Sequence, residues 1–399
     1  MTIPGAWART ARSAMLLGVD GELRPTVFAE MTALAATTGA INLGQGFPDE
    51  DGPREVLDAA REAIAAGVNQ YPPGLGTLEL RTAIAEHQSR FYALDVDPET
   101  EVLVTAGATE AIMATVLALV EAGDEIVTFE PFYDEYAAAI GLSGAVHRTV
   151  PLPAPHFQPD HDDIRAAITD RTRLIIVNNP HNPTGTVLDR AALEVIVEAA
   201  HAHDALIVTD EVYEHLLFDL PHIPIATLPG ARERTITISS AGKTFSTTGW
   251  KVGWLTAPRE LVRVILAIKQ FLTYANGAPF QPAIAVGLRL PDEFFRGLAA
   301  DLKRKRDVLS AGLTAAGFSI TTPEGGYFVV ADAAALGFDD AGEFCRALPS
   351  LAGVVGVPVS AFVREEHRAD YRSLVRFAFC KRFDVLNEAS NRLAGLSTR

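Results

Sequence analysis

Cysteine is scarce in this sequence. The 399 residues contain two, Cys345 and Cys380, both in apolar surroundings and without CxxC or metal-binding spacing. This scarcity excludes a disulfide framework, and we expect both thiols to be free and buried. The ten histidines form no HExxH pattern, and His201 and His203 would face different sides of the helix that they end. We therefore expect no metal site.

Long apolar runs and positive charge are also in short supply. No stretch reaches the length that spans a membrane, and residues 1–12 lack the continuous hydrophobic core of a secretion signal. Lys and Arg number 34 against 50 Asp and Glu, a formal net charge of −16, which argues against a nucleic acid or an anionic membrane as partner. The basic run 303–306 is expected to be a solvated face of a helix over 296–316. We expect a cytoplasmic protein.

Apolar residues, by contrast, make up 48% of the sequence, enough for a large core in a chain of about two domains. Apolar strands alternate with helical segments over residues 102–255, a pattern typical of βαβ units. Internal repeats and low-complexity linkers are missing. The pattern predicts an α/β fold with a mostly parallel sheet.

Two expected strands end in polar residues. The apolar run in 174–185 breaks into a loop that carries Asn178 and Asn182, and the run in 205–213 ends in Asp210 and Tyr213. Both runs are typical of buried parallel strands. Their polar ends are therefore expected at one edge of the sheet.

A third polar stretch, residues 239–251, places Lys243 among small and hydroxyl side chains. A lysine amine attacks an aldehyde only when it is partly neutral, which requires burial or a nearby positive charge such as that of Lys251. The hydroxyl of Ser240 could bind an anion, and Gly242 and Gly249 allow close approach of the backbone to a ligand. A solvated surface lysine is the alternative that local composition leaves open.

Ligands of open α/β sheets bind beyond the carboxyl ends of the strands, so the three stretches predict one site. The residue types fit pyridoxal phosphate, which needs an amine that bonds its aldehyde, a carboxylate facing its ring nitrogen, donors to its phenolic oxygen, and an anion cradle. The candidates, in that order, are Lys243, Asp210, Asn182 with Tyr213, and Ser240 with Lys251.

Three motifs carry a resemblance to a known family: Asn182-Pro183-Thr184-Gly185, Asp210-Glu211-Val212-Tyr213 and Ser240-Ala241-Gly242-Lys243, in this order and spacing. With them the chain resembles the class I aminotransferases of fold type I over nearly its full length. The resemblance implies a large domain, residues 52–282, that binds pyridoxal 5′-phosphate on a mostly parallel sheet. Residues 1–51 would form an N-terminal arm and 283–399 a smaller α+β domain. Small amino acid and 2-oxo acid substrates and a homodimer are also implied.

The same resemblance adds cofactor contacts. Gly107-Ala108-Thr109 would bind phosphate at a helix N-terminus, although an ordinary strand-to-helix turn is the alternative. Tyr133 would lie over the cofactor ring. The alternative is that Tyr133 is only an aromatic residue of the core, but Phe132 is the better candidate for that place. Tyr71 would reach across a dimer to the cofactor phosphate of the second copy.

Arg376 lies in the strand-like run 374–379, where an arginine is costly to bury unless it is paired. By resemblance it would hold the substrate α-carboxylate through a planar two-pronged contact, assisted by Asn178 and beside the backbone of Gly44. A structural ion pair is the alternative.

The implied reaction is a ping-pong transamination. Lys243 would release the cofactor when an amino acid binds, and would then move a proton away from the substrate Cα. Asp210, as a carboxylate, would keep the cofactor ring nitrogen protonated. A 2-oxo acid would then reverse the steps.

The segments expected to determine the substrate resemble two different subfamilies. Segment 240–254 resembles kynurenine aminotransferase and glutamine transaminase K, whereas Thr109 and segment 277–282 resemble the N-succinyldiaminopimelate aminotransferases. Thr109 and Asn276-Gly277 stand where the former have rings, which disfavours aromatic substrates. We expect a longer, polar or acylated donor with 2-oxoglutarate as acceptor. A broad-specificity kynurenine, methionine or glutamine aminotransferase and a cysteine-conjugate β-lyase stay open. A non-enzymatic effector-binding domain is disfavoured because a basic helix-turn-helix extension is missing.

Overall fold

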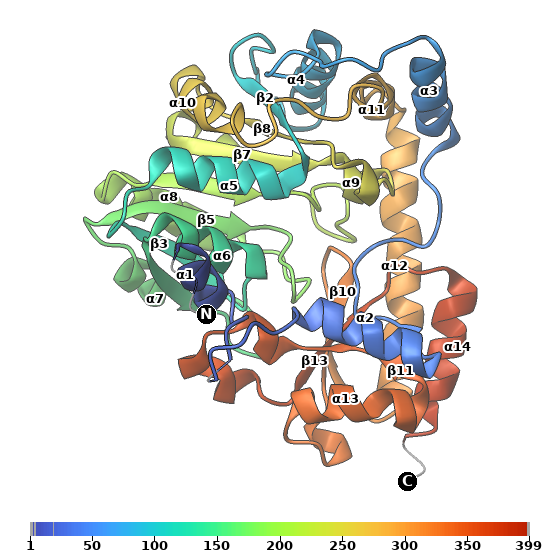
Figure 1. The fold of residues 1–399 in the computed structure, drawn as a ribbon. Helices are drawn as coiled ribbons and strands as arrows, with labels where there is room; N and C mark the ends of the chain where they lie inside the picture. Colours follow the sequence, from blue (N-terminus) through green and yellow to red (C-terminus); the bar gives the residue numbers. More distant parts are fainter. Residues whose placement is uncertain (1–2, 4, 19, 397–399) are drawn as a thin grey trace.

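A seven-stranded sheet dominates the computed structural model, which describes residues 3, 5–18 and 20–396 (Figure 1). In spatial order its strands are β2 (Val102–Thr105), β8 (Gly253–Thr256), β7 (Thr235–Ser240), β6 (Leu206–Asp210), β5 (Thr172–Asn178), β3 (Glu125–Glu130) and β4 (Val146–Pro151). β8 runs antiparallel to both of its neighbours, and the pairs from β7 to β4 are parallel. The predicted α/β fold with a mostly parallel sheet is confirmed.

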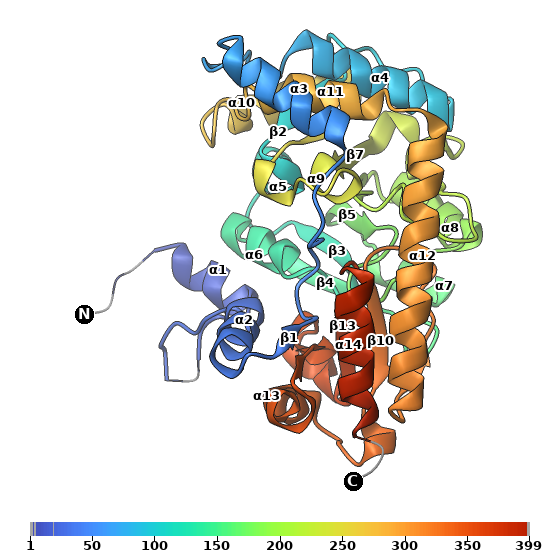
Figure 2. The same cartoon turned by 90° about the vertical axis from the view of Figure 1, so that its right-hand side faces the viewer.

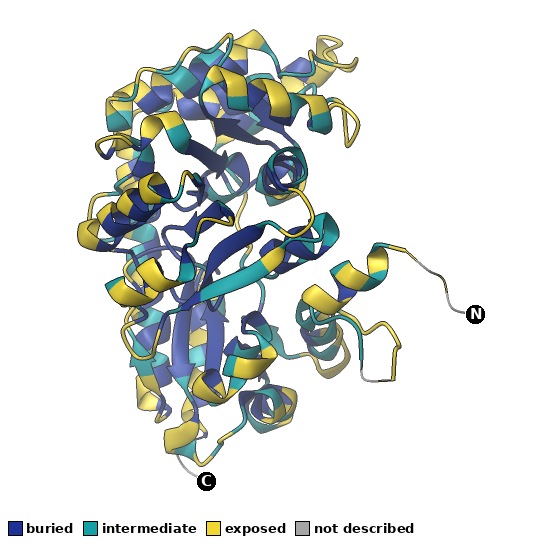
Figure 3. Ribbon diagram, turned by 90° about the vertical axis from the view of Figure 1, so that its left-hand side faces the viewer, coloured by how far each residue is buried: buried dark blue, intermediate teal, exposed yellow. Residues whose placement is uncertain are grey.

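Helices cover both faces of this sheet, which explains why its strands are apolar without alternation. One face packs against α5 (Gly107–Leu119), α6 (Asp134–Ser143) and α10 (Arg259–Lys269). The other face packs against α7 (His161–Ala167) and α8 (Arg190–Ala202). Figure 3 shows most of the strands in the buried colour, an edge strand that is only partly buried, and helices that expose their outer faces.

A third helical layer lies beyond the β2 edge of the sheet, at the top of Figure 1. It consists of α3 (Arg54–Ala65), α4 (Leu78–Tyr92) and α11 (Phe280–Leu288), which pack with β2 and β8 into one apolar cluster. The predicted domain boundary at 282/283 falls inside α11. The division into residues 1–51, 52–282 and 283–399 stays a prediction.

A smaller antiparallel sheet lies below the large one. Its strands in spatial order are β12 (Val357–Pro358), β13 (Leu374–Ala378), β10 (Phe328–Asp332) and β9 (Ser319–Thr321). Helices α12 (Asp292–Ala315), α13 (Ala341–Ala352) and α14 (Phe383–Ala394) pack around it in a shared core. The long helix α12 runs along both sheets (Figure 1). Arg376 therefore sits in the middle of a buried strand, β13.

The N-terminal segment returns to this smaller part of the molecule. β1 (Ile41–Asn42) pairs in parallel with β11 (Val354–Val355), α2 (Val27–Thr38) packs on α13, and α1 (Trp7–Ser13) lies against α6 (Figure 2). The remaining short segments are α9 (Ala241–Thr244) and the 3₁₀ turns η1 (Ile225–Thr227), η2 (Arg232–Arg234), η3 (Thr248–Trp250), η4 (Ala334–Leu336), η5 (Val359–Phe362) and η6 (Glu365–Tyr371).

The basic run on α12 differs from its predicted solvated face. Lys305 and Arg306 are buried, with relative exposures of 4% and 8%. Lys305 pairs with Asp301 at 2.9 Å and with Glu50, while Arg306 donates to the carbonyl of Pro323 at 2.9 Å. The prediction is wrong for these two residues, because α12 is covered by other elements along much of its length. It also begins at Asp292, four residues before the predicted start.

Other predictions can be compared directly with the structure. Cys345 and Cys380 are free and buried, as predicted. Among the described residues, none of the helices combines the length and apolar character needed to cross a membrane.

Candidate active site

A cavity of about 330 Å³ opens at the carboxyl edge of the large sheet, between that sheet and β10 and β13 of the smaller one. It gathers most of the residues predicted from the sequence. Those that line it are Gly107, Ala108, Thr109, Tyr133, Asn178, Asn182, Asp210, Tyr213, Ser240, Lys243, Lys251 and Arg376. Gly44 lies just outside it, and Tyr71 lies elsewhere on the surface.

Lys243 stands in α9, directly after β7. Its Nζ donates a hydrogen bond to the carbonyl of Gly46 at 3.3 Å, and its own carbonyl accepts from the Tyr327 hydroxyl at 2.5 Å. Burial lowers the pKa of Lys243, and the positive charges of Arg376 and Lys251 lower it further, while Asp210 opposes them. The amine is thus held in a setting that favours its neutral, nucleophilic form.

Asp210 ends β6 with its carboxylate inside the cavity. Its Oδ2 accepts from the Tyr136 hydroxyl at 2.6 Å, and Oδ1 accepts from the backbone of Val212 at 3.5 Å. Burial raises the pKa of Asp210 to about 6, and the bond from Tyr136 counteracts that rise. The carboxylate therefore lies ready to face a cationic ring nitrogen.

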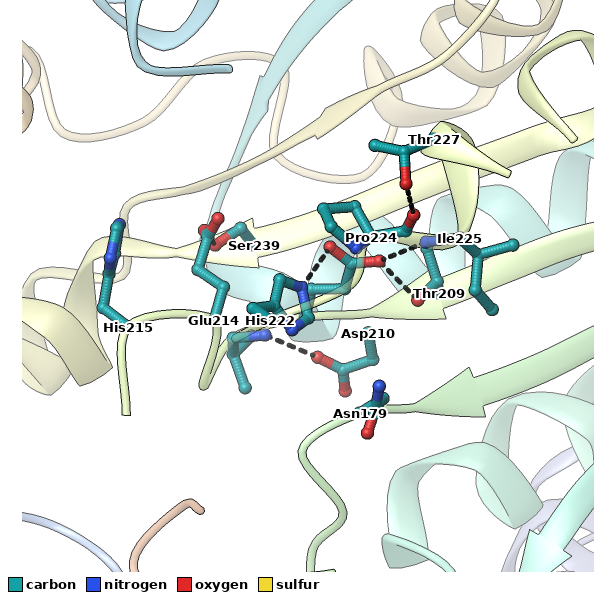
Figure 4. Close-up of polar contacts among 12 residues, drawn as sticks. Asn179, Thr209, Asp210, Glu214, His215, His222, Pro224, Ile225, Thr227 and Ser239 are labelled. Atoms are coloured by element: carbon teal, nitrogen blue, oxygen red, sulfur yellow. Dashed lines mark hydrogen bonds and ion pairs between the residues drawn. The ribbon is translucent and has the colours of Figure 1, made fainter. Parts of the chain in front are cut away.

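A buried polar network lies directly behind Asp210 (Figure 4). Glu211 accepts from His222 Nε2 at 2.8 Å and from Thr209 at 2.9 Å, and Glu214 accepts from Ser239 at 2.5 Å. The Glu211 bonds hold the loop after β6 in place, and the Ser239–Glu214 bond ties that loop to β7, which leads into α9 and Lys243.

The same loop brings together a group of potential metal ligands, although we expected no metal site from the sequence. Ligand atoms of His87, Glu214 and His215 lie within 4.8 Å of one another. Nε2 of His87 lies 2.6 Å from Nε2 of His215, which is a hydrogen bond between neutral imidazoles. Burial lowers the pKa of His87 to about 3. Aromatic rings surround the pair: Phe91, Tyr92 and Phe295.

The opposite end of the cavity offers an anion cradle. Gly107 opens α5 with a φ of +77°, and a Cβ there would lie 3.4 Å from Nζ of Lys251. Lys251 itself has a left-handed φ of +53°, and its side chain lies at the start of α5. Ser240 caps α9 by accepting from the amide of Gly242 at 3.3 Å. Free amides at the start of a helix, an ammonium and a hydroxyl together suit a phosphate.

Arg376 is 1% exposed and stacks on the ring of Phe328, with 3.9 Å from Cζ to the ring centroid. Its Nη1 donates to Asn182 Oδ1 at 2.9 Å and its Nη2 to the carbonyl of Gly44 at 2.8 Å. The predicted proximity of Arg376 to Gly44 is therefore present. These partners are neutral, so the alternative of a structural ion pair finds no support at this arginine among the described residues.

Asn178 lines the same cavity as Arg376, and its predicted part in binding the substrate carboxylate stays a prediction. Its Nδ2 donates to the backbone carbonyl of Asp210 at 2.8 Å, and its Oδ1 accepts from the backbone amide of Asn182 at 2.6 Å. Both ends of its amide thus hold the neighbouring loops, and the side chain that contacts Arg376 is that of Asn182.

Tyr71 is 82% exposed and packs edge-on against Tyr274, with ring centroids 5.8 Å apart. It does not line the cavity of its own chain. Its predicted role depends on a second copy and stays a prediction.

Several cavity residues were missed from the sequence. Phe28, in the N-terminal arm, is one of them. Glu135 is buried, and neither carboxylate oxygen has a well-aligned hydrogen-bond partner among the described residues. Burial, strengthened by the charge of Asp210, raises the pKa of Glu135 to about 8, which favours its protonated, neutral form.

These donors fit the parts of pyridoxal phosphate at separate places in one cavity: the cradle at one end, the Asp210 carboxylate, and the Lys243 amine. The family model of the class I and II aminotransferases matches residues 38–384. The chain belongs to this family. It is an aminotransferase of fold type I that depends on pyridoxal 5′-phosphate and acts on small molecules.

Two curated relatives and one solved structure are similar over nearly the whole chain. A probable N-succinyldiaminopimelate aminotransferase of Mycobacterium tuberculosis is 53% identical, with 94% of this chain and 98% of the relative covered. A methionine aminotransferase of Escherichia coli is 40% identical, with 94% and 97% covered. The solved structure of N-succinyldiaminopimelate aminotransferase from Mycobacterium tuberculosis superposes with a TM-score of 0.93 at 51% identity, covering 99% and 100%.

Proposed function

We propose that this aminotransferase takes N-succinyldiaminopimelate as amino donor and 2-oxoglutarate as acceptor, by a ping-pong mechanism. The observation that carries the proposal is the identity of 53% over nearly the full length with the Mycobacterium tuberculosis relative named for that donor. The absence of a ring at Thr109, inside the cavity, also favours a donor that does not need stacking.

In the proposed site, Lys243 binds the cofactor aldehyde and Asp210 faces the ring nitrogen. Asn182 and Tyr213 donate toward the phenolic oxygen, and Tyr133 lies over the ring. The phosphate is held by the start of α5, with Ser240 and Lys251. These contacts are supported by the shared cavity and by the buried carboxylate at one end and the ammonium of Lys251 at the other. When bound, pyridoxal phosphate supplies an electron sink for the substrate Cα.

The chain's own residues then orient the donor and move one proton. Arg376 binds the α-carboxylate by its planar fork, beside Gly44 and with Asn178 holding the loop. Burial lowers the pKa of Lys243, which favours the free amine. This amine would take the proton from the donor Cα and deliver it to the carbon of the cofactor aldehyde, and with the 2-oxo acid the proton would travel in the opposite direction. Walls of Phe28, Phe328 and Tyr133 keep water from this proton.

We also propose a homodimer in which Tyr71 reaches the cofactor phosphate of the second copy. The support is the surface around it, where Tyr71 and Phe271 expose 82% and 84% of their area, and Tyr274 lies alongside. A cytoplasmic location, with 52–282 as cofactor domain and 1–51 with 283–399 as arm and small domain, completes the proposal. Free thiols at Cys345 and Cys380 suit that reducing compartment.

A broad-specificity enzyme for methionine, glutamine or kynurenine is the second candidate. Three phenylalanines, Phe28, Phe47 and Phe328, border the cavity and offer apolar surface to such side chains. The methionine aminotransferase relative is consistent with this alternative.

A half-reaction screen separates the candidates. Purified enzyme loaded with pyridoxal phosphate receives single additions of N-succinyl-LL-diaminopimelate, methionine, glutamine, kynurenine or glutamate, and the loss of the long-wavelength absorbance of the bound cofactor is timed. Fast loss with the succinylated donor and slow loss with kynurenine supports the proposal. Faster loss with methionine, glutamine or kynurenine than with the succinylated donor would establish the second candidate.

A further inference from the structure

A second cavity, of about 670 Å³, lies beside the active-site cavity. Its walls come from the start of α2, from α13, and from η5 and η6. Residues that are adjacent in the sequence line different cavities. Val27 and Asp134 line the second cavity, while Phe28, Tyr133 and Glu135 line the first. The two cavities are therefore separated by little more than one layer of side chains.

That layer is aromatic and borders the substrate arginine. The rings of Phe28 and Phe362 lie 5.7 Å apart, and the Arg376 guanidinium is 5.3 Å from the first centroid and 4.7 Å from the second. Phe28 is half-buried and sits in the first turn of α2, in the N-terminal arm. The α-carboxylate of a donor bound by Arg376 would therefore lie close to these rings.

The second cavity is rich in arginine, although the protein carries a net charge of −16. Arg24, Arg346, Arg368 and Arg372 line it, together with the carboxylates of Glu30, Asp134 and Asp340. Three of the arginines pair with carboxylates that are exposed or half-buried: Arg24 with Asp20 at 3.8 Å, Arg346 with Glu30 at 3.1 Å, and Arg372 with Asp340 at 3.4 Å. Solvent-exposed pairs of this kind contribute little to stability, so a ligand carboxylate can replace them with small loss.

Arg368 is the least satisfied of the four. Its Nη1 pairs with Glu365 at 2.8 Å, but that carboxylate is 83% exposed. Its Nη2 points to the sulfur of Met15 at 2.9 Å, a weak acceptor, and its buried Nε has no hydrogen-bond partner among the described residues. A guanidinium with two poorly used donors on one side is suited to a bidentate carboxylate.

We propose that this second cavity receives the acidic tail of the amino donor, with Arg368 binding a tail carboxylate. The inference rests on the proposed function, since an N-succinylated diaminopimelate carries two carboxylates beyond the reacting end. The first cavity would hold the cofactor and the reacting end of the donor, and the second cavity beside it offers further space for a succinylated seven-carbon chain. The class of ligand is a long amino acid with an anionic tail, and short or apolar donors do not reach the second cavity.

The test compares Arg368→Gln with Arg296→Gln in the cofactor-loaded enzyme. Arg296 is a matched control because it also pairs with a glutamate three residues earlier, Glu293, but lies on α12 outside both cavities. Steady-state kinetics is measured with N-succinyl-LL-diaminopimelate, with 2-aminopimelate, which has a free tail carboxylate, and with methionine. Arg368→Gln should raise KM for both acidic donors about tenfold or more, with kcat and the methionine constants within about twofold of wild type. Arg368→Lys, which keeps the charge without the fork, should give an intermediate KM.

The outcomes separate the two proposals. A wild-type enzyme that ignores the succinylated donor overturns the proposed function, and the KM for 2-aminopimelate then decides the cavity assignment. Unchanged KM values for both acidic donors in Arg368→Gln would overturn that assignment. An equal rise for methionine would do the same, because it would reveal a general structural effect, which a thermal unfolding curve of each variant checks independently.

Discussion

The hydroxyl of Tyr136, at the start of α6, donates a 2.6 Å hydrogen bond to Oδ2 of Asp210 at the end of β6. Both groups are buried, so the bond operates where charge is poorly solvated. Burial raises the pKa of Asp210 to about 6, and this bond is the largest influence that lowers it. Tyr136 thus keeps the carboxylate ionised at neutral pH, the form that a protonated ring nitrogen requires.

The substitution Tyr136→Phe should raise the pKa of Asp210. Losing a hydrogen bond to a charged group destabilises the carboxylate by roughly 1.5–3 kcal/mol, which corresponds to a rise of about 1–2 pKa units. We expect the affinity for pyridoxal phosphate to decline at a pH about one unit or more higher than in wild type. Cofactor titrations between pH 5 and 9 measure this, with Tyr371→Phe as control, because its hydroxyl bonds backbone carbonyls only in the described contacts. Superimposable pH curves would contradict the role given to Tyr136.

Asp210→Asn should stabilise the cofactor-free protein while abolishing activity. The folded-state pKa of about 6 lies above the ordinary value of 3.8, so the native state holds the proton more tightly and wild type loses stability as pH rises from about 4 to above 6. A pKa difference of about two units corresponds to a loss of about 3 kcal/mol in the free energy of unfolding. The asparagine side chain of the variant does not ionise and therefore avoids this loss. Urea unfolding should show a more stable variant at pH 7.5 and little difference at pH 4. A variant less stable than wild type at pH 7.5 would refute the argument.

Lys243→Ala should remove both turnover and covalent attachment of the cofactor. Borohydride treatment followed by mass spectrometry should find the reduced cofactor on Lys243 in wild type and on no residue in the variant. Lys251→Ala is the control: it keeps the attachment and weakens cofactor affinity, because it removes one charge from the anion cradle. Cofactor fixed to another lysine in Lys243→Ala would move the assignment.

Arg376→Ala should raise KM for donor and acceptor alike, because both present an α-carboxylate to one guanidinium. Two charge-assisted hydrogen bonds make a rise of about 100-fold or more the expectation. Arg376→Lys keeps the charge but loses the planar fork, so its KM values should lie between those of wild type and those of Arg376→Ala. Circular dichroism checks folding, since Asn182 and Gly44 also lose their donor. A rise confined to one substrate would mean that the two carboxylates bind at different places.

Much of the large sheet and its site could be predicted from the sequence. The runs that end in Asn178 and Asp210 are buried strands, and strand ends at one edge bring their polar residues together whatever the details of packing. Lys243 follows from the same logic, one strand further along. These residues could be predicted because an apolar strand pattern and a polar side chain suited to the cofactor occur together in each segment.

The missed features depend on contacts between distant parts of the chain. Phe28 lines the cavity because the N-terminal arm folds back onto the smaller sheet, and Lys305 is buried because Glu50 and Asp301 reach it. Asn178 and Asn182 are alike in type, and only the path of the loop decides which one meets Arg376. Periodicity and composition carry no information on such pairings.

The proposed sharing of the site between two copies can be tested by mixing two inactive variants. In a hybrid dimer of Lys243→Ala and Tyr71→Ala, one site loses both residues, while the other combines an intact Lys243 with an intact Tyr71 from the first variant. Random exchange makes about half of the dimers hybrid, so activity should recover to roughly a quarter of the wild-type value. Each variant alone stays nearly inactive, because every site lacks one residue. Mixing after brief exposure to low urea, followed by assay and by sizing of the assembly, measures the recovery. If hybrids form and no activity returns, Tyr71 serves the site of its own chain or none. That outcome would also leave the 82% exposed ring without the contact that the proposed dimer gives it.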